Sequence, residues 1–192
     1  MFGDNGILTA AAPGSPDARP DPAGEFSVPN VYPGAYRVLP HNAPPGYFLD
    51  SIRLGDAEVT APEVEISVPG ISLTLVYKTN GGAVRGSVEN CASGGIVVVP
   101  QDPVLRRPGF LRSMACGGGM AIAGTAPGSS GPYEVDALRP GDYYILAISG
   151  GGPTPWYRIR LDDALLSQAA KVTIRPGETS SADLRAFGPD AR

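Results

Sequence analysis

The stretch GEFSVPNVYPGAY, residues 24–36, occurs a second time as GPYEVDALRPGDY, residues 131–143. Both copies follow the pattern Gly-x-aromatic-x-Val-x-x-aliphatic-x-Pro-Gly-x-Tyr, with no gap between them. An internal repeat is the strongest indication of architecture that a single sequence carries. The sequence therefore predicts two related modules in tandem.

Each copy predicts a strand, a tight turn and a second strand. The aromatic residue and the valine alternate with polar neighbours, which is the pattern of a half-buried strand. Pro-Gly fits a type II turn, because proline fixes φ at the first central position and glycine tolerates a positive φ at the second. Tyr36 and Tyr143 follow the turns, and two interpretations stay open for them. They hydrogen-bond back across the corner, as a tyrosine does in immunoglobulin-like sandwiches, or they are ordinary core aromatics.

Composition favours short strands joined by many turns. The 192 residues include 26 Gly and 21 Pro, together with 42% hydrophobic residues, and this Gly/Pro content is about twice the average. The net charge of -4 and the scattered arginines do not support nucleic-acid binding. No apolar stretch reaches the ~18 residues of a membrane span. The N-terminus has no basic start and no long apolar core, so it does not read as a signal peptide.

The repeat also predicts the domain boundaries. Pro69-Gly70 and Pro176-Gly177 have the same 107-residue offset as Gly24 and Gly131. A polar, flexible joint is expected near residues 78–82, so the first module spans residues 1–78 and the second spans 79–192. Counting back by the offset places the counterparts of strands 83–88 and 96–99 before Met1. We therefore expect an incomplete first module, in a chain that is a fragment of a longer protein.

The repeated pattern, with Gly86-Ser87-Val88 and the following apolar strand, resembles carboxypeptidase regulatory-like domains. These are small transthyretin-like (prealbumin-like) β-sandwiches, related in fold to carbohydrate-binding modules. The segment 45–55 is similar to the strand that follows the pattern in multi-repeat bacterial proteins of this type. A short helix at 162–170 is similar to their closing segment. The expected fold is thus all-β, two tandem prealbumin-like or immunoglobulin-like antiparallel sandwiches, the first incomplete and the second with one short helix.

The resemblance implies a non-catalytic structural or interaction module of a larger secreted or cell-envelope bacterial protein. It implies an extracellular or envelope location, no cofactor, and neighbouring domains or other envelope proteins as partners. The alternative is a carbohydrate-binding module that takes polysaccharide.

Two cysteines form the first candidate site. Cys91 and Cys116 both lie at predicted strand ends of the second module. In an oxidising compartment they form a possible disulfide, which would close about 25 residues and contribute roughly 3 kcal/mol. In a reducing compartment they are small buried residues.

Three aromatic residues form the second candidate site. Trp156 and Tyr157, near Tyr144, either make a stacking platform for sugar rings or form a core cluster against the helix at 162–170.

No residue set predicts catalysis or metal binding. His41 is the only histidine and lies in a predicted turn, where a solvated surface histidine is the expected role. No Gly-x-Ser-x-Gly motif presents a nucleophile. Asp162 and Asp163 suit the positive end of a helix dipole without a cation. The sequence therefore predicts no enzyme.

Overall fold

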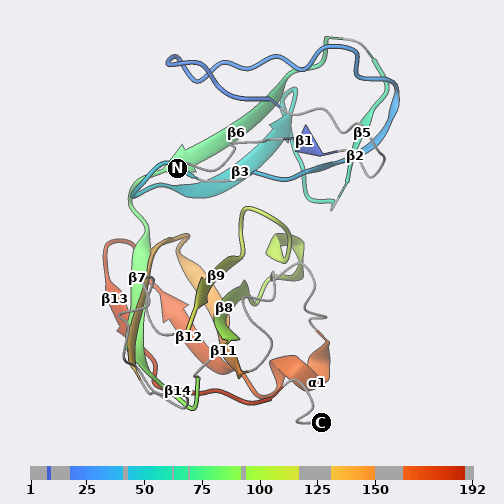
Figure 1. Ribbon diagram of the computed structural model, residues 1–192. Helices are drawn as coiled ribbons and strands as arrows, with labels where there is room; N and C mark the ends of the chain where they lie inside the picture. Colours follow the sequence, from blue (N-terminus) through green and yellow to red (C-terminus); the bar gives the residue numbers. More distant parts are fainter. Residues whose placement is uncertain are drawn as a thin grey trace.

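Strands and tight turns alternate along the described chain, as the glycine and proline content predicts. The computed structural model describes residues 8–9 (backbone only), 18–40, 43–61, 63–68, 70–91, 94–116, 131–149 and 162–188. Figure 1 shows the first module above the second, with the chain passing from β6 into β7. The predicted all-β sandwich-type fold is confirmed: antiparallel sheets dominate, and the described residues include one short α-helix.

The first module contains two three-stranded antiparallel sheets, in the orders β1-β2-β5 and β4-β3-β6. Its strands are β1 (Leu8–Thr9), β2 (Gly34–Val38), β3 (Phe48–Leu54), β4 (Ala57–Glu58), β5 (Val64–Ile66) and β6 (Leu73–Lys78). Val38, Leu49, Ile52 and Val64 are buried between the sheets.

The second module contains two larger sheets, β10-β7-β13 with β14 also on β7, and β12-β11-β8-β9. Its elements are β7 (Gly82–Glu89), β8 (Gly94–Pro100), the 3-10 helix η1 (Pro103–Leu105), β9 (Arg112–Ala115), β10 (Gly131–Leu138), β11 (Gly141–Ser149), α1 (Asp163–Leu166), β12 (Ala170–Ile174), β13 (Thr179–Ser181) and β14 (Leu184–Arg185). β13 and β14 run parallel to β7, and the other ladders of this module are antiparallel.

β8 is buried on both of its faces, as its unbroken apolar sequence predicts. Ile96 and Val98 belong to the main core between the sheets. Val97 and Val99 belong to a second cluster that includes Leu166 of α1. The short helix therefore covers the outer face of β8. It is shorter than the predicted 162–170, because the described residues after Ser167 turn into β12.

The corner before β2 and β11 is the same in both modules. The Tyr36 hydroxyl donates to Tyr32 O at 2.7 Å, and the Tyr143 hydroxyl donates to Arg139 O at 2.7 Å. Each tyrosine therefore fastens its strand to the backbone four residues earlier. Of the two interpretations left open, the tyrosine corner is confirmed.

The predicted type II turn at the repeated Pro-Gly is wrong. Gly34 and Gly141 open their strands with φ of +157° and +151°, far from the φ of about +80° that such a turn requires. The left-handed residue lies earlier, at Asn30 (φ 60°) and its counterpart Ala137 (φ 50°). The chain therefore turns before the proline. The later turn fits type II better, because Gly177 has a φ of 68° and Glu178 N donates to Arg175 O at 3.2 Å.

Two expectations for the first module need correction. Residues 24–31 form no strand, whereas their counterpart β10 pairs with β7. A strand needs a partner for its hydrogen bonds, and the described first module has no counterpart of β7. The counterpart of β8, expected to be missing, is present as β1. Leu8 lies opposite Val38 in β2, as Val98 lies opposite Ile145 in β11.

Candidate functional site: the contact between the modules

The joint between the modules is tightly packed, which corrects the prediction of a flexible joint. β6 ends at Lys78 and β7 begins at Gly82. A Cβ atom on Gly81 would lie 2.9 Å from Leu138 O and 3.0 Å from the Phe48 ring. Gly81 O also accepts a hydrogen bond from Gly177 N at 3.1 Å. The joint is thus enclosed by both modules, and only a glycine fits at position 81.

A loop of the second module, residues 101–111, contacts the first module, and we call it the bridging loop. Asp102 starts its 3-10 helix, because the Asp102 side chain accepts a hydrogen bond from Val104 N at 2.9 Å. Phe110 belongs to the core of the first module, whereas Leu111 belongs to a cluster of the second. Two consecutive side chains therefore insert into different modules.

Arg107 is the polar centre of this contact. Its side chain donates to Ala61 O at 2.8 Å and to Val59 O, both in the first module. Its guanidinium lies over the Phe110 ring, 5.1 Å from the centroid, which is within cation–π range. Arg107 is 8% exposed. It joins the bridging loop to the backbone of the first module.

Burial disfavours the charge that Arg107 carries. Desolvation lowers the pKa of the Arg107 guanidinium, and the Glu58 carboxylate opposes this shift. An arginine pKa starts above 12, so Arg107 stays charged at neutral pH. Its Nε atom has no hydrogen-bond partner among the described residues. The two carbonyl bonds and the stacked ring must therefore offset the desolvation of a charge.

A second polar contact crosses the joint. Asp50 of β3 forms an ion pair with Lys78 (Nζ to Oδ2, 2.8 Å), and Arg139 of the second module approaches the same carboxylate (Nε to Oδ1, 3.6 Å). At 3.6 Å the Arg139 contact is ionic rather than a hydrogen bond. Asp50 thus lies between cations from both sides of the joint.

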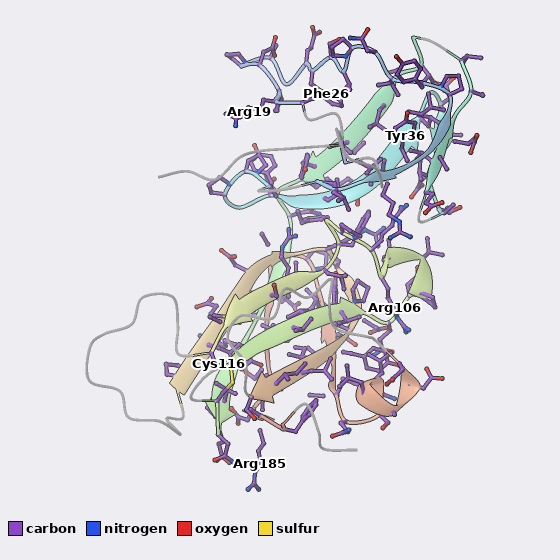
Figure 2. All side chains as sticks on the ribbon, turned by 45° about the vertical axis from the view of Figure 1, so that its right-hand side comes forward. Arg19, Phe26, Tyr36, Arg106, Cys116 and Arg185 are labelled. Carbon is purple, nitrogen blue, oxygen red and sulfur yellow. A yellow bond between two sulfur atoms is a disulfide. The ribbon has the colours of Figure 1, made fainter. Side chains whose placement is uncertain are left out.

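The structure joins Cys91 and Cys116 through a disulfide, which appears as the yellow bond at Cys116 in Figure 2. Cys91 follows β7 and Cys116 follows β9, so the bond connects the two sheets of the second module. Cys91 is also part of the main core.

The predicted aromatic platform is described only in part. Trp156 and Tyr157 lie outside the described residues, as does His41. The Tyr144 ring has Arg106 at 5.6 Å and Lys171 at 5.9 Å from its centroid. Two cationic side chains therefore lie over the Tyr144 ring.

Asp162 has a structural role. Its side chain accepts a hydrogen bond from Leu165 N at 2.9 Å and caps α1, as a helix start requires. Within the part of the chain that the structure describes, no cluster of His, Cys, Asp or Glu side chains has the arrangement of a metal site.

Two buried tyrosines of the second module have strongly raised pKa values. Burial raises the pKa of Tyr133 to about 12, and the Asp183 carboxylate adds to this shift. Burial also raises the pKa of Tyr143 to about 12, with Arg139 and Arg112 opposing it. Both hydroxyls donate to backbone carbonyls, of Ala182 at 2.6 Å and of Arg139 at 2.7 Å. These are structural bonds, and neither tyrosine is poised as a base near neutral pH.

Arg107 and Phe110 were not predicted from the sequence as contact residues. The sequence did contain an indication that this loop is buried, because it carries apolar side chains beside two arginines and exposed loops are seldom apolar. Val104, Leu105, Phe110 and Leu111 supply that indication.

Comparisons with protein-family models, with curated proteins and with solved structures each found no match. No helix among the described residues is long and apolar enough to cross a membrane.

Proposed function

We propose that this chain is a non-catalytic structural and interaction module of a larger secreted or cell-envelope bacterial protein. Its two modules act as one stiff spacer between neighbouring domains. The observation that carries this proposal is the bridging loop, in which Arg107 and Phe110 of one module insert into the other. Modules held only by a flexible linker would move independently.

Two further observations support the proposal. The disulfide between Cys91 and Cys116 fits an oxidising compartment, because such bonds are rare in the cytosol. The repeated pattern resembles carboxypeptidase regulatory-like domains, whose typical role is accessory rather than catalytic.

Backbone NMR relaxation on the full chain tests the stiffness. We expect one rotational diffusion tensor to fit the amides of β3 and of β11 together. Arg107→Ala should loosen the contact and give each module its own tensor. Two independent tensors in the unmodified chain would refute the spacer role.

The compartment has a separate test. Chain secreted into a bacterial periplasm should contain no free thiol by titration after denaturation. Two free thiols would remove the support that the disulfide gives to a secreted location.

A further inference from the structure

One edge of the first module is open in the described part of the chain. β6 is the outer strand of the sheet β4-β3-β6. Val59 N donates to Ile52 O at 2.8 Å, so the backbone groups of Ile52 point toward β4. Leu75 lies opposite Ile52 in the ladder. Ile52 and Leu75 are therefore a non-hydrogen-bonded antiparallel pair, in which each residue directs its N–H and C=O groups away from the other strand. The N–H and C=O of Leu75 thus face the open edge of β6.

In the second module the equivalent edge is paired. β13 and β14 are the counterparts of β6 at the 107-residue offset, and both pair with β7 in parallel. Ala182, the counterpart of Leu75, donates its N–H to Arg85 O of β7 at 3.0 Å. The comparison with Ala182 and the pairing of β3 with β6 therefore agree that Leu75 N–H points toward the open edge.

β7 also pairs on its other side, with β10. The counterpart of β10 is the segment 24–31, which forms no ladder. The first module therefore has both neighbours of a β7-like strand, namely β6 and residues 24–31, and neither is paired on that side within the described residues. Figure 2 shows Phe26 and Tyr36 on this module, above Arg106 of the bridging loop.

Burial differs between the modules at matching positions. Apolar side chains that are buried in the second module are only half-buried in the first. The matched pairs are Tyr133 and Phe26, Leu138 and Val31, Tyr143 and Tyr36, and Leu184 and Tyr77. In the second module these residues share a core with Val84 and Val88 of β7. The first module lacks that covering strand among its described residues.

We propose that the first module binds one extended strand of a partner polypeptide between β6 and residues 24–31. The strand lies parallel to β6 and antiparallel to residues 24–31, as β7 does between its neighbours. Main-chain hydrogen bonds supply affinity and alternate side chains supply selectivity, as in other cases of strand addition.

β7 defines the chemistry of the partner strand. Val84 and Val88 point into the core. A Cβ on Gly86 would overlap the backbone carbonyl of Ala182, so the strands approach too closely there for any side chain. The partner strand therefore follows the pattern Gly-x-Val-x-Gly-x-Val.

Hydrogen exchange by NMR on the full chain tests the proposal, with the synthetic peptide GAVRGSVE, the sequence of β7, as the probe. We expect Leu75 N–H to exchange at least tenfold more slowly with saturating peptide, and the amide signals of Phe26 and Val28 to shift. Two matched peptides serve as controls. One carries Gly86→Val, and the other carries N-methyl groups at Ala83 and Arg85, whose backbone groups face β13 in the second module. Both should leave Leu75 unchanged.

A fused version guards against weak binding in trans. The same eight residues, joined ahead of Met1 by a Gly/Ser linker, reach an effective concentration on the order of millimolar. The proposal is wrong if neither the free nor the fused strand slows exchange of Leu75 N–H, or if the control peptides slow it equally.

It is also wrong if Leu75 N–H is already protected in the free chain. Protection that grows with protein concentration would then identify a second copy as the cover, and constant protection would identify the chain itself. The NMR relaxation of the modules does not enter this test, so the spacer role stands or fails separately.

Discussion

Replacing Arg107 with alanine should weaken the first module, although Arg107 belongs to the second. The substitution removes the donors for Val59 O and Ala61 O. A hydrogen bond to a charged group contributes about 1.5–3 kcal/mol, so the gross loss is about 3–6 kcal/mol. Removing a desolvated charge with an unpaired Nε offsets part of this loss. We expect a net destabilisation of about 2–4 kcal/mol.

Hydrogen exchange of the amides in β3 measures this effect directly. A loss of about 2–4 kcal/mol corresponds to roughly 30- to 900-fold faster exchange, if these amides exchange through opening of the first module. Amides of β8 and β11 should change much less, because both backbone acceptors of Arg107 lie in the first module.

Arg106→Ala is the matched control. Arg106 is the preceding arginine of the same loop, and it donates only to Pro100 O and Gln101 O of its own module. Its removal should leave the exchange of β3 unchanged. Unchanged exchange in β3 after Arg107→Ala, or an equal acceleration after Arg106→Ala, would contradict this role of Arg107.

Three further predictions concern the second module. Its stability should fall as the pH rises from 10 to 12, by up to about 1.4 kcal/mol per pH unit for each buried tyrosine. The folded state keeps the protons of Tyr133 and Tyr143 up to about pH 12, whereas the unfolded state loses them near pH 10. Urea unfolding at pH 9 and 11.5 measures this, and equal midpoints would contradict it. Replacing both cysteines of the disulfide with serine should destabilise by roughly 3 kcal/mol in the same assay, and an unchanged midpoint would count against a formed bond. Gly86→Ala should cost at least about 2 kcal/mol of stability, because its Cβ would overlap Ala182 O. Gly131→Ala, where a Cβ meets open space, should stay within about 0.5 kcal/mol, and equal midpoints for the two variants would contradict the close approach.

Strands were predictable from the sequence where an apolar pattern lies in a segment that also finds a neighbouring strand to pair with. Alternating apolar residues mark β7 and β10, and the unbroken apolar run of β8 predicts its burial on both faces. Residues 24–31 have the same pattern as β10, yet they form no strand, because pairing depends on a neighbour that periodicity does not reveal. The role of β1 as the counterpart of β8 was missed, because the repeat does not keep its 107-residue offset before the first pattern.

The contact between the modules was not predictable from residue types. Arg107 and Phe110 belong to a loop whose apolar side chains indicate burial but do not indicate which module covers them. Only the fold places Val59 O and Ala61 O within reach of the guanidinium. The cysteine pair was the part of the candidate sites with a clear signal, since both residues flank predicted strands.

The disulfide also determines which parts of the chain would carry a mechanical load. The sequence between Cys91 and Cys116 includes the whole bridging loop. Tension applied to the two ends of the oxidised chain passes through the sulfur–sulfur bond, so the backbone of this loop is not stretched. Reduction would release this segment, whose two cysteines are 25 positions apart, and lengthen the extensible chain by roughly 80–90 Å. The redox state of one bond thus sets how far this spacer extends under force.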